Sequence, residues 1–338
     1  MVSYNIFSQM AEDPELARAT GVRMRVATFF FQKPISEDPE TYNKVQELKN
    51  SGVKCVRHGF ELIEEELGRG AHSELKDAYQ HLAPVIDTDQ YMVWLTGRVV
   101  SLGAELRHAE ITHRLLDIEA DLLHQFKADA IVNCTGLGAM VTAADDNVYP
   151  LRGCLIRVKN DGFSMPKVTK ALCVPHDDSK ADMGNSEDLV FIVPRSEKVL
   201  LLGGSVEPHE WGLDLNLDNS ALVRTMLDRC VNFLPALKNA ELIDDFPVAV
   251  GLRPFRKGNV RLGAAGGSSN NKLSIRAGSR IVHNYGHGGS GFTLSHGCAE
   301  EVVQIVQRML ESHRDTHCDS CTQSTMLGVQ VESQRYSM

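Results

Sequence analysis

The stretch RIVHNYGHGGSGFTLSHGCAEE, residues 280–301, decides the fold because it joins a short apolar run to a glycine cluster and then to a helix. Ile281 and Val282 form the apolar run, and the apolar residues from Leu294 to Met309 recur with helical spacing. A strand, a glycine turn and a helix start bring backbone N–H groups and the positive end of a helix to one place. We therefore predict that this turn faces an anionic or carbonyl-rich ligand, although a plain strand-to-helix turn has the same pattern.

Gly286, Gly288 and Gly291 also spell G-x-G-x-x-G, the pattern of dinucleotide-binding turns. That interpretation requires a second strand after the helix, with an acidic residue about 20 positions on that binds the ribose. Here Asp315 and Asp319 lie in a polar segment without strand periodicity. We therefore do not interpret the turn as a dinucleotide fingerprint.

The composition indicates a globular protein. A length of 338 residues with 43% hydrophobic residues suits one large domain or two modest ones. The net charge of −9 argues against nucleic acid or an anionic membrane surface as the main partner. No apolar run reaches the ~18 residues of a membrane span. The eight cysteines lack framework spacing, which indicates reduced thiols and a cytoplasmic location.

Residues 1–150 have a mixed helix and strand pattern. We predict a strand over 22–31, a helix over 36–49 and a second helix that ends at Gly103. Asp87 and Gln90 predict a capping box for that second helix, and Met92 and Val99 belong to its expected apolar face. The run DAIVNCTG, 129–136, predicts a buried parallel strand that ends either at a binding edge or in an ordinary loop.

From residue 151 the pattern changes to alternating strands, which we expect at 152–158, 189–193, 198–202, 247–252 and 260–262, with a helix over 222–234. The polar segment 177–187 predicts a surface loop or lid. Beyond residue 311 we expect a disordered tail without a metal site. One C-x-x-C with nearby histidines is a weak zinc signal, and the side chains in question are those of His313, His317, Cys318 and Cys321.

Six short segments follow one another in a fixed order: VNCTG at 132–136, RG at 152–153, FIVP at 191–194, LGGS at 202–205, GLRPFR at 251–256 and HNYGHGG at 283–289. In order and spacing they resemble the D-amino-acid oxidase and D-aspartate oxidase family of flavoenzymes, from about residue 21 to residue 310. The resemblance implies an α/β fold in which a Rossmann-like FAD-binding domain is interleaved with an antiparallel β-sheet substrate domain.

On this basis we expect four regions. Residues 1–150 would be a remnant of the FAD-binding domain with part of the substrate domain, and 151–262 the β-rich substrate domain. Residues 263–312 would return to the FAD-binding domain, and 313–338 would be the tail.

The resemblance also implies an enzyme that oxidatively deaminates a D-amino acid to an imino or 2-oxo acid, with FAD as hydride acceptor and O2 converted to H2O2. Arg253 would bind the substrate carboxylate at two points, and the Gly289 carbonyl would face the amino group. From the residues alone, Arg253 is equally a structural ion pair, and we expect Arg256 and Arg261 to be surface charges. The implied cofactor contacts are Gly288, Gly291, Phe292 and Thr293 at the flavin ring and Cys134, Thr135 and Gly136 along the ribityl and adenosine side.

Two departures from the family pattern bear on function. Phe191 stands where the family has a substrate-binding tyrosine, and the loss of one hydrogen bond to a charged group costs about 1.5–3 kcal/mol. Nothing before Gly136 has the family's glycine fingerprint. We therefore expect that the N-terminal dinucleotide-binding unit is lacking, that the parallel strands have an unpaired edge and that FAD is retained weakly.

Three functions remain open at this point. The first is a D-amino-acid oxidase whose sequence here is incomplete. The second is a short relative without tight FAD binding that acts as a small-molecule binding or non-redox pathway protein, and the third is a non-catalytic protein that pairs with another chain.

The partners implied by the first function are a D-amino acid and O2, and the family admits a homodimer. It also admits a peroxisomal location, although residues 336–338 give no clear signal for one. The sequence leaves acidic and neutral substrates open, with Lys180, Arg195 and His209 as possible cationic contacts.

Overall fold

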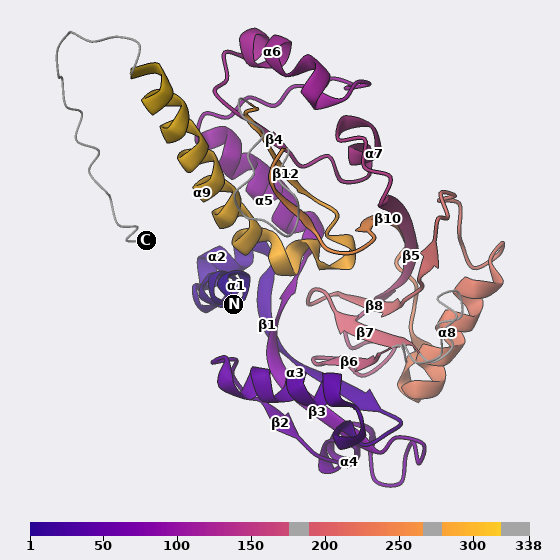
Figure 1. Ribbon diagram of the computed structural model, residues 1–338. Helices are drawn as coiled ribbons and strands as arrows, with labels where there is room; N and C mark the ends of the chain where they lie inside the picture. The colour runs from indigo at the N-terminus through magenta and orange to yellow at the C-terminus, as the bar shows by residue number, and fades with distance from the viewer. Residues whose placement is uncertain (176–188, 266–278, 319–338) are drawn as a thin grey trace.

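The computed structural model describes residues 1–175, 189–265 and 279–318, with side chains up to residue 312. Their strands form two sheets (Figure 1). The larger has nine strands in the order β10-β5-β8-β7-β6-β1-β3-β2, with β9 paired to β5, and the smaller has the order β11-β12-β4. The mixed α/β architecture predicted from the sequence is confirmed.

The strands are β1 (Val22–Phe31), β2 (Arg57–His58), β3 (Asp77–Ile86), β4 (Ile131–Asn133), β5 (Val148–Lys159), β6 (Ala171–Val174), β7 (Val190–Pro194), β8 (Val199–Gly203), β9 (Glu207–Pro208), β10 (Val248–Arg256), β11 (Arg261–Ala264) and β12 (Ile281–Tyr285). The α-helices are α1 (Val2–Glu12), α2 (Pro14–Thr20), α3 (Pro39–Asn50), α4 (Glu61–Leu67), α5 (Thr88–Ser101), α6 (Leu115–Phe126), α7 (Ala139–Thr142), α8 (Ala221–Phe233) and α9 (Gly291–Cys318). The 3-10 turns are η1 (Ile35–Glu37), η2 (Gly136–Gly138), η3 (Pro235–Asn239) and η4 (Gly288–Ser290).

The larger sheet separates two sets of side chains because successive residues of a strand point to opposite faces. Even-numbered residues of its strands, such as Ile156, Ile192 and Leu202, are fully buried in a core that includes Met226 of α8. Figure 1 shows α8 covering this side of β5, β7 and β8. Odd-numbered residues therefore face the other way, and this second face carries the end of β10 that concerns function.

The smaller sheet has β12 at its centre, parallel to β4 and antiparallel to β11. The parallel strand predicted in 129–136 is therefore confirmed as β4, with Ile281 opposite Ile131, but it is not buried as we expected, because Val132 is 43% exposed. Val282, Val302 and Met309 form a buried cluster between β12 and α9. The strand predicted at 260–262 pairs with β12, so it belongs to this sheet and not to the β-rich region in which we expected it.

Helix α5 begins where we predicted, but its capping and its faces differ. The Asp87 side chain makes no capping hydrogen bond, and the Gln90 side chain instead donates to the carbonyls of Arg18 and Ala19. Met92 and Val99 are 48% and 37% exposed, which contradicts the predicted apolar face. The buried side of α5 is formed by its aromatic residues, with Tyr91 stacked edge-on against Phe7 and Phe292.

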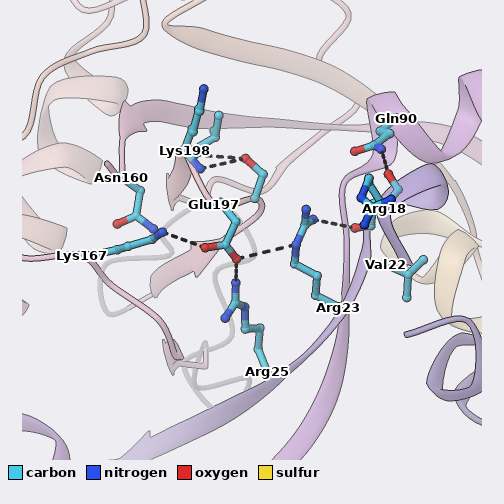
Figure 2. Close-up of polar contacts among 12 residues, drawn as sticks. Arg18, Val22, Arg23, Arg25, Gln90, Asn160, Lys167, Glu197 and Lys198 are labelled. Carbon is cyan, nitrogen blue, oxygen red and sulfur yellow. Dashed lines mark hydrogen bonds and ion pairs between the residues drawn. The ribbon is translucent and has the colours of Figure 1, made fainter. Parts of the chain in front are cut away.

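Ion pairs of Glu197 link the turn between β7 and β8 to β1 (Figure 2). Glu197 accepts hydrogen bonds from Arg25 and from Lys167 Nζ, the latter at 2.7 Å, and lies 3.7 Å from Arg23 Nε. Strand β1 in turn pairs along its whole length with β3, a strand that the sequence pattern did not predict. The N-terminal strands thereby extend the larger sheet.

Several predictions fall on residues outside the described ranges, namely the segment 177–187 with Lys180, Cys321 and the side chains of His313, His317 and Cys318. The backbone of α9 continues to Cys318, beyond residue 311, where we predicted the start of a tail. No helix within the described ranges is long and apolar enough to cross a bilayer. No His, Cys, Asp and Glu side chains in the same ranges form a group of three that could hold a metal ion.

Candidate active site

The C-terminal end of β10 lies directly against the glycine turn that follows β12 (Figure 1). An isolated bridge joins Phe255 to His287, so the two segments run antiparallel. Gly286 and Gly288 have φ angles of +85° and +54°, which side chains rarely adopt. A Cβ on Gly286 would also lie 2.7 Å from Arg256 Cβ, and one on Gly288 would lie 2.8 Å from the Phe255 ring. The glycines therefore allow the turn to approach the strand closely.

Arg253 occupies the same contact region. A Cβ on Gly289 would lie 3.6 Å from Arg253 Cδ, so the predicted substrate arginine and the predicted catalytic glycine are neighbours. The guanidinium lies over Gly153 of β5, where a Cβ would be only 2.0 Å from Nη1. Its Nη1 donates a hydrogen bond to the Ser205 carbonyl oxygen at 3.1 Å. Sequence segments that lie far apart thus meet around one guanidinium.

The partners of Arg253 differ from those of two arginines beside it. Arg152 donates two hydrogen bonds of 2.9 and 2.8 Å to Glu207, and Arg256 Nε donates one of 2.7 Å to Asp145. No carboxylate in the described residues forms an ion pair with Arg253, whose pKa is lowered by burial. An arginine that is partly buried with only a carbonyl partner is suited to bind an anionic ligand.

The loop after β4 reaches the same strand. A Cβ on Gly136 would lie 3.4 Å from Pro254 Cβ. Asn133, at the end of β4, accepts hydrogen bonds from the Thr135 backbone N–H at 3.2 Å and from its hydroxyl at 2.8 Å. Cys134 is exposed between them. The predicted segment 134–136 therefore lies beside β10, and Asn133 fixes its conformation.

Hydrogen bonds between buried polar groups stabilise the conformation of this loop. Asn133 Nδ2 lies 3.3 Å from His283 Nδ1 on the neighbouring strand β12 and donates to Thr142 Oγ1 at 3.2 Å. Burial and the positive charge of Arg261 lower the pKa of His283 to about 4. The imidazole is therefore neutral at pH 7, and its Nδ1 can accept the hydrogen bond from the amide. Asn133 and His283 belong to motifs that we had quoted, but the sequence did not indicate that they meet.

The start of α9 is open around Gly291. No side chain caps η4, and a Cβ on Gly291 would have no atom within 4 Å. The Phe292 ring packs against Tyr91, so only its backbone is available to a ligand, whereas Thr293 is exposed. An uncapped helix start beside open space fits the electron-rich edge of a flavin ring.

Phe191 lies on the same face of the larger sheet as Arg253. It pairs with Gly203, which pairs with Leu155, so the odd-numbered residues of β7, β8, β5 and β10 share one face. The two residues are three strands apart, roughly 14 Å across the sheet, and Arg253 lies four residues beyond Ala249, the residue level with Phe191, roughly 13 Å along it. The Arg253 guanidinium extends back over Gly153, which brings it nearer to Phe191. Phe191 packs against a buried apolar cluster that includes Cys173 and Val193.

Four residues that we expected to be surface charges or cationic substrate contacts have defined surroundings. Arg256 is not a surface charge, because its side chain is 16% exposed and bonded to Asp145. Arg195 lies 3.4 Å from Asp87 and 3.0 Å from Asp89, so it is neutralised at the start of α5. His209 is exposed and stacks on Tyr149, with ring centroids 4.4 Å apart. Arg261 lies opposite Tyr285 in the smaller sheet.

Asp145 and Tyr285 were not among the predicted site residues. The Tyr285 hydroxyl donates to Asp145 at 2.9 Å, beside the hydrogen bond from Arg256. Tyr285 stands within a quoted motif, but Asp145 follows small residues in a segment without periodicity. Only tertiary contact brings the two together.

The sequence is similar to those of curated amino-acid oxidases. The chain is 31% identical to a D-amino-acid oxidase from Rubrobacter xylanophilus over 303 residues, which cover 90% of this chain and 76% of the relative. It is 31% identical to the D-aspartate oxidase of Homo sapiens over 226 residues, 66% of this chain and 55% of the human protein. The chain therefore spans little more than half the length of the human relative.

Among solved structures, the fold is similar to that of glycine oxidase from Geobacillus kaustophilus, with a TM-score of 0.67, 19% identity and coverage of 90% of this chain and 77% of the other. The family described as DAO, FAD dependent oxidoreductase, matches residues 14–305. Because that match and the bacterial relative each extend over most of the sequence, the chain belongs to the DAO family of FAD dependent oxidoreductases.

Proposed function

We propose that this chain oxidises a D-amino acid at its α-carbon, with an imino acid and H2O2 as products. The observation that carries the proposal is the guanidinium of Arg253, which lies beside Gly289 without a carboxylate partner in the described residues. A buried cation without a counter-ion costs free energy, and a bound carboxylate removes that cost. The substrate would supply this carboxylate.

The proposed binding mode uses the fork geometry of a guanidinium. One N–H of Arg253 donates to the Ser205 carbonyl, which orients the group. The remaining N–H groups can donate to both oxygens of a carboxylate, a two-point contact that an ammonium cannot make. The Gly289 carbonyl would accept from the substrate amino group, so the α-carbon would be held between two fixed contacts.

FAD, when bound, supplies the hydride acceptor. The backbone of residues 288–293 would line the flavin ring, and residues 134–136 would lie along its ribityl and adenosine side. The start of α9 would stabilise negative charge on the ring, because the N–H groups of a helix start point outward. No acid or base from the protein is needed for this role.

The surroundings favour a neutral substrate side chain over an acidic one. Phe191 packs against a buried apolar cluster that includes Cys173 and Val193, on the face that carries Arg253. Arg195 is already paired with Asp87 and Asp89, so it is a poor receptor for a second carboxylate. D-alanine should therefore be a better substrate than D-aspartate.

Anaerobic reduction of the flavin by a D-amino acid tests the proposal, with FAD added in excess. Arg253→Ala should lower the second-order rate of flavin bleaching by about 10- to 150-fold or more, the equivalent of 1.5–3 kcal/mol per lost charged hydrogen bond. Arg157→Ala is the matched control, because Arg157, at the end of β5 far from Gly153, also donates only to backbone carbonyls, those of Asp245 and Phe246. It should leave the rate unchanged.

Two results would contradict the proposal. If Arg253→Ala and Arg157→Ala lower the rate of flavin reduction equally, Arg253 does not bind the substrate carboxylate. If no D-amino acid bleaches the flavin of the unmodified chain while an L-amino acid does, the proposed stereochemistry is wrong.

A further inference from the structure

Asp145 joins the two sheets beside the proposed site. Its Oδ2 accepts hydrogen bonds from Arg256 Nε at 2.7 Å and from the Tyr285 hydroxyl at 2.9 Å. Arg256 ends β10 in the larger sheet, and Tyr285 ends β12 in the smaller sheet. Asp145 itself lies in the segment that leads from α7 to β5. We name these three residues, Asp145, Arg256 and Tyr285, the Asp145 junction.

The Asp145 junction requires an ionised carboxylate. The second oxygen, Oδ1, accepts from the backbone N–H and the side-chain amide of Asn147, both at 3.1 Å. Burial would raise the pKa of Asp145, but the hydrogen bonds from Arg256, Tyr285 and Asn147 outweigh burial and lower it to about 2. A carboxylate can satisfy four donors, whereas an amide presents only one oxygen and turns an N–H toward the remaining donors.

Both strands that meet at Asp145 lead directly into the proposed site. Arg253 precedes Arg256 by three residues in β10, roughly 10 Å along the strand. The glycine turn begins immediately after Tyr285, and a Cβ on Gly286 would lie 2.7 Å from Arg256 Cβ. The separation between the carboxylate-binding arginine and the turn therefore depends on how these strand ends are fastened.

We infer that Asp145 is a positioning residue that fixes the distance between Arg253 and the glycine turn at residues 286–291. The inference rests on the proposed function. The Asp145 junction acts on the orientation of the substrate toward the flavin and not on its affinity, because Arg253 keeps its own contact with Ser205 when Asp145 changes. A displacement of about 1 Å at a reacting centre lowers the rate about 100-fold.

The test compares Asp145→Asn and Tyr285→Phe with Asp77→Asn. Asp77 is a suitable control because its side chain is 13% exposed, close to the 10% of Asp145. It also accepts several hydrogen bonds, including one of 2.9 Å from the Ile35 backbone N–H, and it lies in β3, far along the sheet.

Two measurements are made on each variant. Anaerobic flavin reduction gives the maximal rate and the substrate concentration at half-maximal rate. Hydrogen–deuterium exchange of the amides at 286–291 is followed in the chain without FAD, so this readout does not depend on activity.

Asp145→Asn should lower the maximal rate about 10- to 100-fold, with the half-saturating substrate concentration changed less than about threefold, and should speed exchange at 286–291 by about tenfold or more. Tyr285→Phe should cause a smaller change of the same kind, and it keeps the test valid if Asp145→Asn does not fold. Asp77→Asn should change thermal stability alone.

The outcomes separate this inference from the proposed function. If Arg253→Ala retains flavin reduction, the proposed function fails whatever Asp145 does. If Arg253→Ala abolishes reduction while Asp145→Asn and Tyr285→Phe keep the normal maximal rate and normal exchange, the inference on Asp145 alone is wrong. A rise in half-saturating concentration at an unchanged maximal rate would also overturn it, because that pattern belongs to binding and not to positioning.

Discussion

Replacing Gly153 with alanine should displace the Arg253 guanidinium although residue 253 itself is unchanged. A Cβ at position 153 would lie 2.0 Å from Arg253 Nη1 and 2.3 Å from Cζ, far inside contact distance. The guanidinium is the free end of a flexible side chain, so it can move aside, but it then loses its hydrogen bond to Ser205. The substitution therefore displaces one functional group while the surrounding strands stay in place.

The expected magnitudes follow from this geometry. Gly153 has an ordinary strand backbone, where alanine is favoured over glycine by about 0.5–1 kcal/mol, which offsets only part of the about 1.5–3 kcal/mol lost with the hydrogen bond to Ser205. Loss of one charged hydrogen bond to the substrate carboxylate costs about 1.5–3 kcal/mol, which raises KM about 10- to 150-fold. The free energy of unfolding should thus fall by less than the free energy of substrate binding does.

The assay measures KM for flavin reduction by a D-amino acid together with thermal unfolding. Gly251→Ala is the matched control, because Gly251 pairs with Gly153 in the strand register and a Cβ there would meet no atom within 4 Å. It should leave KM unchanged. In an Arg253→Ala background, Gly153→Ala should cause no further loss, since its effect acts through the guanidinium. Additive losses in the double variant would refute the reasoning.

Two further predictions concern His283 and Phe191. Burial and Arg261 lower the pKa of His283 from 6.5 to about 4. As the pH falls, the unfolded chain therefore binds a proton at His283 before the folded chain does. The free energy of unfolding should fall by about 3 kcal/mol between pH 6.5 and pH 4. Urea unfolding across that range should show this loss, and a slope that persists in His283→Gln would assign it to another group. Phe191→Tyr should lower KM for a D-amino acid about tenfold or more by adding one hydrogen bond to the carboxylate, with the maximal rate unchanged. An equal KM in both proteins would show that position 191 does not reach the substrate.

Local patterns in the sequence predicted the elements with strong periodicity. The strand at 22–31 and the helix at 222–234 were predicted within one residue of their ends, as β1 and α8. These segments have buried apolar residues at regular spacing, so local pattern and tertiary environment agree. The start of α5 was also correct, although its capping box was not, because Gln90 finds partners in α2 instead.

The errors arose where long-range contacts decide the structure. Strand β3 contains Pro84 and has no clean alternation, yet it pairs with β1 along its whole length. Strand β11 lies close in sequence to β10 but pairs with β12, because sheet membership depends on which edge is available and not on neighbouring sequence. Arg256 was interpreted as a surface charge because its partner, Asp145, is 111 residues away in the sequence.

The glycines explain why the quoted motifs occur together in one chain. Four consecutive residues of β10, 253–256, meet glycines of three distant segments, and at each contact a side chain would approach the strand to 3.6 Å or less. The contacts are Gly153 and Gly289 with Arg253, Gly136 with Pro254, Gly288 with Phe255 and Gly286 with Arg256. Motifs that are far apart in the sequence thus pack against the same end of β10 in the fold. A chain that kept Arg253 but filled position 153, 286 or 288 would move the guanidinium or the turn that faces it, because a Cβ there would lie within 3 Å of the strand's side chains. Arg253 and these three glycines therefore act as one unit.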